Sequence, residues 1–549
     1  MRKARMTAIP LATIALVATL PLSASAEGVW SQKGADIPGA AIGDGFGIAL
    51  DIDGDGDTVA IGADSNNDGG SDSGHVQVLG YSAGAWSRIG SILVGDDADD
   101  FFGSAVSLSD DGTRVAIGAP FDDDGGGSSG HVQVWENVGG TWSQMGATLV
   151  GEDAGERAGS SVAISGDGTT VVIGSPFNDD GGTDRGEVRV YTWNSGTSTW
   201  DRTGTADLQG EADQDRLGYS VAINTDGTII AAGARDNDGT GSAAGHARVY
   251  TWNTGTSQWD QRGSDIDGEA TGDRFGTAVS LSADGDALAV GAPKNNIGGT
   301  ATDAGHVQVY DWNSGTSAWV QRGSDVDGAA GDLLGTSVSL SSSGSRLAVG
   351  APGGDTGGVD AGFARLYEWD GVSWTSLGVD HGGSAGDEAG TAVSLSGAGS
   401  DVAMGLPFND DVAANAGLVQ VFTYTLSVSE VAQVAGTPGI YLHVAGPVGR
   451  SAQGSPVYYG SDRVAITSTY LLSLTSTTGR TQRILATGVV DARGNLEAMA
   501  PLPALMAGTY DVVFTGRHHG GVGLSLSARI TIGDDGRIVS LQDNVAVMD

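Results

Sequence analysis

A glycine that recurs seven times, at intervals of 55 to 59 residues, is the feature that most restricts how this chain can fold. A second glycine follows each copy after 15 residues, in a run that reads VAIGAP in its clearest form. Such a constant offset indicates a hairpin of fixed register, because one inserted residue would turn every inward side chain outward. The pairs are Gly47 and Gly62, Gly103 and Gly118, Gly159 and Gly174, Gly218 and Gly233, Gly276 and Gly291, Gly335 and Gly350, and Gly390 and Gly405.

Each repeat also carries two further strand signals. A third glycine opens a strand such as GHVQV at residues 130–134, and a strand led by tryptophan, such as TWSQMG at residues 141–146, ends the unit. Four short strands per unit, repeated seven times, predict an all-β fold in which each unit is one blade of a seven-bladed β-propeller.

The two ends of the repeat array complement each other. The last copy stops after its third strand, LVQVFTY at residues 418–424, while VWSQKG at residues 29–34 is a fourth strand without a blade. Pairing these strands would complete blade seven and remove two open sheet edges. We therefore predict that the N-terminal strand closes the ring.

Residues 1–26 have the composition of a secretory signal peptide. Basic residues at the start precede an apolar stretch over residues 8–20, and Ala24-Ser25-Ala26 forms a small-residue cleavage site. No later segment is apolar for the length of a membrane span, and the chain has no cysteine. We expect a secreted, soluble monomer that is extracellular or at the cell surface, with the periplasm left open.

Charge divides the rest of the chain into two parts. The net charge is −40, and nearly all of the acidic excess lies in residues 27–424, whereas residues 425–549 are almost balanced. This contrast predicts a propeller domain at 27–424 and a separate domain at 425–549. So acidic a propeller would repel nucleic acid and anionic membranes and attract cations. Solubility in a salty environment is an alternative explanation of the charge.

The acidic residues concentrate on one predicted face. Because strands alternate in direction within a blade, the loops from strand two to three and the loops between blades emerge together. Loops at the mouth of a propeller commonly bind ligands, although each single loop also fits a solvated turn. The predicted ligand-binding residues are Asp96, Asp97, Asp99, Asp100, Asp122, Asp123, Asp124, Asp179, Asp180, Asp236, Asp238, Asp410 and Asp411.

The repeat resembles a known family, the FG-GAP repeat of integrin α-subunits and of many secreted bacterial proteins. Its clearest copy here is FGSAVSLS…VAIGAPFDDD…GHVQVW over residues 102–135, and the resemblance covers residues 29–424. The phenylalanine is kept at Phe46, Phe102 and Phe275 alone. The resemblance implies a propeller that serves binding or adhesion, but a propeller is a scaffold for unrelated sites.

Many members of this family hold Ca²⁺ in the turn between strands one and two. The first copy places Asp51, Asp53, Asp55 and Asp57 at alternate positions, a spacing that suits an oxygen-ligated Ca²⁺ loop, with a plain hairpin turn as the alternative. The acidic residue expected at the ninth position is Val59. The six other turns lack the first carboxylate, so we expect them to be plain β-turns.

Recurrent aromatic and histidine residues are expected to pack between blades. Seven tryptophans share one position on the fourth strand, where large rings would fill the widening space at the rim. His75, His131, His246 and His306 each follow a strand-opening glycine, and phenylalanine and leucine replace them in other copies. This exchange predicts a half-buried wall position and poor metal ligands.

No catalytic motif is readable, so we expect a binding protein and not an enzyme. The polar departures from the repeat on the acidic face, which include Arg157, Tyr219, Arg235, Lys294 and His381, are scattered over several blades. The leading interpretation is a secreted or surface-associated adhesion protein whose acidic face binds a glycan or a protein, with Ca²⁺ as a possible cofactor. A polysaccharide-active enzyme and a passive envelope or matrix protein are the alternatives.

Residues 425–549 alternate in the manner of short strands and predict an Ig-like β-sandwich. The stretch VVDARGNLEAMAPLPALMAGTYDVVFTG, over residues 489–516, resembles the Ig-like modules of bacterial surface proteins. His518-His519 is expected to form a hairpin loop and not a metal site.

Overall fold

The computed structural model describes residues 28–299 and 301–426, together with the backbone of strands between residues 440 and 544. Regular secondary structure in this described part of the chain consists of β-strands, as the all-β prediction required. The predicted signal peptide at 1–26 and the loop at His518-His519 lie outside the described residues.

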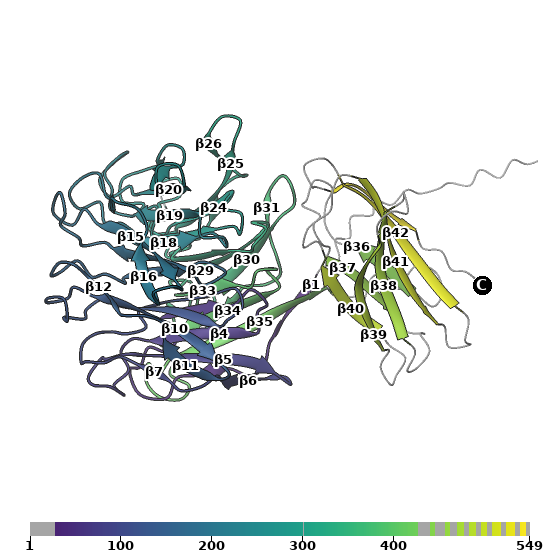
Figure 1. Cartoon of the computed structure of the whole chain (residues 1–549), viewed down its shortest axis with the longest axis horizontal. Coiled ribbons are helices and arrows are strands. Elements are labelled where there is room, and N and C mark those ends of the chain that lie inside the picture. The colour runs from purple at the N-terminus through teal and green to yellow at the C-terminus, as the bar shows by residue number, and fades with distance from the viewer. Residues whose placement is uncertain are drawn as a thin grey trace, which may run out of the picture.

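Seven sheets, one for each repeat, form the propeller drawn in Figure 1, and their innermost strands line a channel, which confirms the predicted seven-bladed β-propeller. The first six sheets begin at their inner edge with the strands β3 (Ala49–Ile52), β8 (Ala105–Leu108), β13 (Ser161–Ile164), β18 (Leu217–Ile223), β23 (Ala278–Leu281) and β28 (Ser337–Leu340). The second strands are β4 (Thr58–Ala63), β9 (Arg114–Ala119), β14 (Thr170–Ser175), β19 (Ile229–Ala234), β24 (Ala287–Ala292) and β29 (Arg346–Ala351).

In the outer half of each blade, a long third strand pairs along its outer side with two shorter strands. The third strands are β5 (His75–Ser82), β10 (His131–Val138), β15 (Glu187–Asn194), β20 (His246–Asn253), β25 (His306–Asn313) and β30 (Phe363–Trp369). The fourth strands are β6 (Ala85–Arg88), β11 (Thr141–Gln144), β16 (Thr199–Arg202), β21 (Gln258–Gln261), β26 (Ala318–Gln321) and β31 (Trp374–Ser376). A two-residue strand then pairs with the start of the third strand: β7 (Leu93–Val94), β12 (Leu149–Val150), β17 (Leu208–Gln209), β22 (Ile266–Asp267), β27 (Val326–Asp327) and β32 (His381–Gly382).

Blade seven is completed by the N-terminal strand, as predicted. Its inner strands are β33 (Val393–Leu395), β34 (Asp401–Leu406) and β35 (Leu418–Leu426), and β1 (Gly28–Gln32) pairs antiparallel with β35 at its outer edge. The short β2 (Ile37–Pro38) also pairs with β35. Backbone hydrogen bonds between the two ends of the array therefore close the ring.

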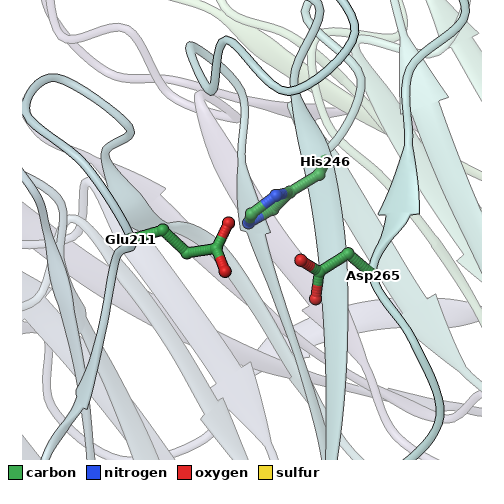
Figure 2. A group of neighbouring side chains, drawn as sticks. All are labelled: Glu211, His246 and Asp265. Carbon is green, nitrogen blue, oxygen red and sulfur yellow. The ribbon is translucent and has the colours of Figure 1, made fainter.

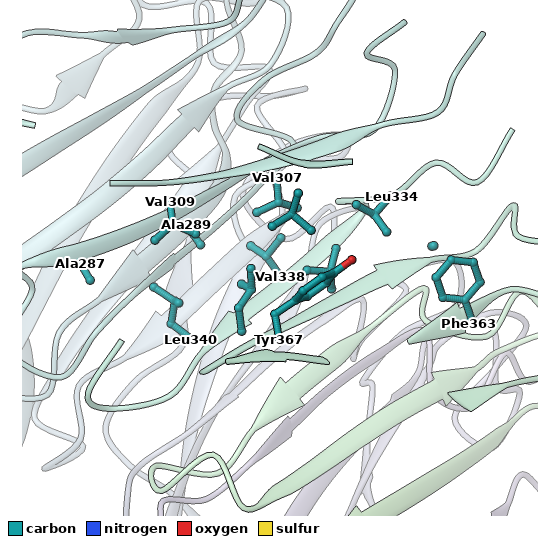
Figure 3. Close-up of a cluster of buried hydrophobic side chains, with 13 residues drawn as sticks. Ala287, Ala289, Val307, Val309, Leu334, Val338, Leu340, Phe363 and Tyr367 are labelled. Atoms are coloured by element: carbon teal, nitrogen blue, oxygen red, sulfur yellow. The ribbon is translucent and has the colours of Figure 1, made fainter. Parts of the chain in front are cut away.

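The hydrophobic core lies in clusters between neighbouring blades. In the cluster of Figure 3, Val307 of blade five packs with Leu334, Val338 and Phe363 on the side of blade six. The second strands are buried on both faces because each blade is covered by a neighbour on either side. The seven tryptophans of the fourth-strand position are buried or half-buried, which confirms their packing role.

The constant 15-residue offset between glycines has a steric cause. Gly103 donates its N–H to the carbonyl of Gly118 in the same blade at 2.9 Å. A Cβ on Gly118 would lie 2.1 Å from the carbonyl oxygen of Gly159 in the next blade. Each VAIGAP-type glycine is therefore the point where two blades meet backbone to backbone.

The strands after residue 426 form two sheets. One has the order β36 (Ile440–Val444), β37 (Pro456–Ser461), β40 (Leu496–Pro501), and the other contains β39 (Gln482–Val489), β38 (Thr469–Ser476), β41 (Gly508–Arg517), β42 (Gly523–Ile532) and β43 (Ile538–Asn544). The Ig-like assignment stays a prediction.

Candidate functional site on the acidic loop face

The two ends of the channel are built from different loops. We call the end that carries the turns between strands one and two the turn end, and the opposite end, with the two-to-three and interblade loops, the loop face. At the turn end, seven equivalent residues form a closed ring of backbone hydrogen bonds of 2.8 to 3.2 Å, each N–H donating to the carbonyl of a neighbouring blade. The members are Gly54, Asp110, Gly166, Thr225, Ala283, Ser342 and Gly397.

The predicted calcium turn takes part in this architecture. Asp51 faces the channel, where its carboxylate accepts hydrogen bonds from Ser394 Oγ at 2.7 Å and from the backbone N–H of Leu108 at 2.8 Å. Asp53 Oδ1 accepts from two backbone N–H groups of its own turn. Asp57 pairs with Lys33 at 2.9 Å, and Asp55 is exposed.

The structure therefore does not bring Asp51, Asp53, Asp55 and Asp57 together as one ligand set. The Asp53 position is occupied by serine or asparagine in the other blades, and these side chains accept hydrogen bonds from the same part of the turn, as Ser109 does from Arg114 N at 3.0 Å. Turn closure accounts for this part of the motif without an ion.

Burial raises the pKa of Asp51 to about 6, against the lowering effect of its hydrogen bonds from Ser394 and Leu108. The carboxylate borders a channel cavity of ≈ 320 Å³ that is otherwise lined largely by small and aliphatic side chains of the innermost strands. The anion is disfavoured there because the loss of hydration on burial outweighs the hydrogen bonds that the carboxylate accepts.

Most of the predicted ligand-binding carboxylates are exposed on the loop face. Exposed members are Asp96, Asp97, Asp99, Asp123, Asp124, Asp179, Asp180, Asp238, Asp410 and Asp411. Asp236 is half-buried among Arg216, Arg235 and Arg274, and Asp100 and Asp122 are buried. Three of the exposed residues also stabilise their own loops, since Asp179, Asp238 and Asp410 each accept the N–H five residues later.

Beneath this exposed layer lies a ring with one acidic residue per blade. Each carboxylate accepts a backbone N–H of its own interblade loop: Asp44, Asp100, Glu156, Asp215, Asp273, Asp332 and Asp387. In three blades a buried asparagine 22 residues later donates to the same carboxylate: Asn178, Asn295 and Asn409. These acids position the loops.

Blade two departs from this arrangement. Asp122 replaces the asparagine, so two buried carboxylates face each other, and burial together with the charges of Asp122, Asp97 and Asp123 raises the pKa of Asp100 to about 7. His131 Nδ1 lies 3.1 Å from Asp122 Oδ2.

The most unusual feature of the loop face is a cluster of arginine and aromatic side chains. The residue two before each FG-type glycine has a positive φ, which is uncommon outside glycine. Arg157 (φ 55°) occupies this position in blade three, where its N–H donates to Ser128 O and its carbonyl accepts from Ser160. This geometry fixes the backbone from which the arginine side chain extends.

The guanidinium of Arg157 lies between two phenyl rings, 4.4 Å from the centroid of Phe121 and 4.4 Å from that of Phe177. Next to it, Arg235 stacks on Tyr219 at 3.6 Å. Within the described residues, Arg157 has neither an ion pair nor a side-chain hydrogen bond, although it lies on a face crowded with carboxylates. Its N–H donors are therefore free for a ligand.

These side chains line one pocket of ≈ 350 Å³. Its walls come from three neighbouring blades: Pro120, Phe121, Arg157, Ser160, Pro176, Phe177, Tyr219 and Arg235. A planar guanidinium held between two rings in this pocket suits a carboxylate or another planar polar group. The surrounding aspartates would repel a second negative charge.

Arg157, Tyr219 and Arg235 were expected to be scattered, and that expectation was wrong. Arg157 lies in a loop of blade three, whereas Tyr219 lies in β18 of blade four and Arg235 directly follows β19, yet all three line one pocket. Repeat alignment shows which element a residue is in but not how far its side chain reaches. The signal available in the sequence was the pairing of phenylalanine with Pro120 and Pro176 beside an arginine position.

The histidine prediction also needs correction. His75, His131, His246 and His306 are buried and not half-buried, with exposures of 1 to 2%. His246 and His306 each lie with two carboxylates whose ligand atoms fall within 4.8 Å of one another: Glu211 and Asp265 with His246 (Figure 2), and Glu269 and Asp325 with His306. These groups could hold a metal ion. The acids come from neighbouring loops, which spacing alone does not place beside a histidine.

The fold defines the protein as a seven-bladed β-propeller whose repeats carry different side chains at the loop face. The FG-GAP repeat family model matches residues 86–135, 142–191 and 265–310. The chain is therefore a seven-bladed β-propeller that contains FG-GAP repeats, a repeat type that suggests a scaffold for binding or adhesion and that commonly binds calcium.

Other comparisons show only distant similarity. A fungal alcohol oxidase of the AA5 family, in complex with copper, aligns with 14% identity and a TM-score of 0.42 over 92% of this chain and 100% of that one. An acylaminoacyl peptidase from Pyrococcus horikoshii aligns with 9% identity and a TM-score of 0.36 over 75% of this chain and 57% of the peptidase. These scores are too low to support a functional conclusion.

No curated protein matches the chain. Among the residues that the structure describes, no helix has the length and apolar character needed to cross a membrane.

Proposed function

We propose that this protein is secreted or surface-associated and that its loop face binds a glycan or protein ligand, with the Arg157 pocket at the centre of the contact. The observation that carries the proposal is the unpaired Arg157 guanidinium, stacked between Phe121 and Phe177 on a face rich in aspartate. Keeping an arginine free of nearby carboxylates suits a ligand that supplies its own anionic group.

The acidic rim restricts the ligand further. The rim residues Asp96, Asp97, Asp123 and Asp124 would repel a uniformly anionic polymer. A ligand with one carboxylate for Arg157, flanked by neutral or cationic groups that face the rim, would be complementary in charge to the whole surface. Ca²⁺ held by exposed rim carboxylates would extend the range to anionic glycans, and we propose it as an accessory ion on this face.

We also propose that the pocket binds and does not catalyse. The side chains that line it are proline, phenylalanine, arginine, serine and tyrosine. This set offers hydrogen-bond donors and stacking surfaces, but it lacks a carboxylate or imidazole to act as general base.

The test is an array of purified polysaccharides and extracellular proteins, probed with the labelled chain from residue 27 and followed by biosensor titration of each hit. We expect Arg157→Ala to lower the affinity for the ligand at least about tenfold, because one charged hydrogen-bonded contact is lost. Arg157→Lys should recover only part of this affinity. Arg88→Ala, an exposed arginine on the outer strand β6, is the matched control and should leave affinity unchanged.

Failure has two distinguishable forms. Binding that survives Arg157→Ala would move the site away from this pocket. No saturable binding to any polysaccharide or protein, with or without Ca²⁺, would favour the passive envelope protein.

A further inference from the structure

Blades four and five differ at one repeat position that contacts two acidic residues. The third residue of the third strand lies between an acid of the preceding interblade loop and an acid just before the last short strand of its own blade. In blade four this residue is Arg248. Its guanidinium donates to Asp265 at 2.9 and 3.0 Å and forms an ion pair with Glu211.

In blade five the same position is Gln308. Its Nε2 donates to Glu269 Oε1 and to Asp325 Oδ1, both at 3.1 Å. Tyr310 donates its O–H to Gln308 Oε1 at 2.5 Å, which fixes the amide with its N–H groups toward the carboxylates. An amide is neutral, so it cannot offset two negative charges as an arginine does.

No lysine or arginine among the described residues forms an ion pair with Glu269 or Asp325. Blade five thus carries the same acids as blade four without the cation that neutralises them there.

One ring nitrogen of the blade-five histidine is unsatisfied. His306 is 1% exposed, and its Nε2 is buried without a hydrogen-bond partner. Its Nδ1 lies 3.9 Å from Asp325 Oδ2, beyond hydrogen-bond range. A buried polar group without a partner costs about 1 to 3 kcal/mol. One ligand atom from each of Glu269, His306 and Asp325 nevertheless lies within 4.8 Å of the others.

We propose that Glu269, His306 and Asp325 form a binding site for a divalent transition-metal ion, with Zn²⁺ as the best match, and that the corresponding group in blade four does not bind one. An imidazole nitrogen with two carboxylate oxygens is a ligand set that Zn²⁺ accepts, whereas Ca²⁺ prefers oxygen alone. Three protein ligands leave a coordination position for water or for a group of a bound partner.

Blade four shows why the arginine matters. Figure 2 shows the carboxylates of Glu211 and Asp265 on either side of His246, the same constellation as in blade five. There the guanidinium of Arg248 contacts both carboxylates and supplies the positive charge that a metal ion would bring. The two blades therefore form a natural pair of test site and control.

The test is equilibrium dialysis of the chain from residue 27 against Zn²⁺, with the bound metal measured by elemental analysis. His306→Phe and Gln308→Arg both introduce residues that other blades carry, Phe363 at the first position and Arg248 at the second, so the fold should accept them. Each should bind one Zn²⁺ fewer than the unmodified protein, and Arg248→Gln should bind one more.

X-ray absorption at the zinc edge provides a second readout that does not depend on the variants folding. The proposal expects one imidazole nitrogen and carboxylate oxygens around the bound metal. Unchanged stoichiometry in both His306→Phe and Gln308→Arg, or a zinc environment without imidazole, would overturn it. Failure of Arg248→Gln to gain a metal ion would overturn the role given to the arginine.

Discussion

At the turn end of the channel, seven equivalent residues make the same backbone hydrogen bond to a neighbouring blade. At the loop face, the equivalent residues before each FG-type glycine are Phe101, Arg157, Arg216, Arg274, Leu333 and Glu388, with glycine in the first blade. Both ends are formed by the same repeats. The difference teaches that backbone hydrogen bonds can close the ring whatever side chains the residues carry. Because the ring is held at the turn end, the side chains at the loop face can vary from blade to blade.

The largest effect should come from breaking the invariant frame. Gly118→Ala places a Cβ 2.1 Å from the Gly159 carbonyl of the next blade, so the blades must move apart. We expect a loss of about 4 kcal/mol or more in the free energy of unfolding, measured by chemical denaturation, because such overlap with backbone cannot relax cheaply.

Gly127→Ala is the matched control for this substitution. Gly127 lies in a variable loop with nothing within 4 Å of a Cβ, so stability should change by less than about 0.5 kcal/mol. Equal losses in the two variants would show that the repeat glycines are not steric contact points.

A smaller effect tests the turn end. The pKa of Asp51, about 6 against an ordinary value of 3.8, means that the folded state binds this proton more tightly than the unfolded state. Stability from this group is therefore present at low pH and lost as pH rises through about 6. Relative to Asp51→Asn, the native protein should gain on the order of 1 to 2 kcal/mol between pH 7 and pH 4, with allowance for water in the channel.

Denaturation at several pH values checks this prediction. Asp55→Asn, at an exposed position of the same turn, is the matched control. A stability difference between native protein and Asp51→Asn that grows with rising pH in favour of the native protein would contradict the assigned environment.

At the loop face, Asp122→Asn should stabilise the protein by about 1 kcal/mol at pH 8, because it restores the asparagine found in blades three, five and seven. The raised pKa of Asp100 makes the native protein recover stability as pH falls through about 7, so the advantage of the variant should shrink at pH 5. Thermal unfolding at the two pH values measures it. A stability gain of Asp122→Asn that is the same at both pH values would contradict the proposed coupling of Asp122 to the titration of Asp100.

The smallest effect on stability belongs to the residue expected to matter most for binding. Arg157→Ala removes stacking on two rings but no ion pair, so the free energy of unfolding should fall by no more than about 1 kcal/mol. Denaturant unfolding beside the biosensor titration separates the two effects. A loss of several kcal/mol would mean that Arg157 serves the fold.

The seven blades and the closing strand were predictable because glycine spacing and strand periodicity are local properties of the chain. The Arg157 pocket was not, since it depends on side chains from three blades meeting above the channel. The turn at Asp51 shows the reverse problem: its spacing matches an ion-binding loop, yet in the ring Asp51 faces Ser394 and Leu108 of neighbouring blades. Sequence spacing reports neighbours along the chain, and closure of the ring adds neighbours from other repeats.

The most direct test of which end of the channel binds ions and ligands is a calorimetric titration with Ca²⁺ of three proteins. These are the chain from residue 27, a turn-end variant with Asp51→Asn and Asp55→Asn, and a loop-face variant with Asp123→Asn and Asp124→Asn. The account predicts that the binding heat persists in the turn-end variant and falls in the loop-face variant. Loss of the heat in the turn-end variant, or no heat from the unmodified protein, would contradict it.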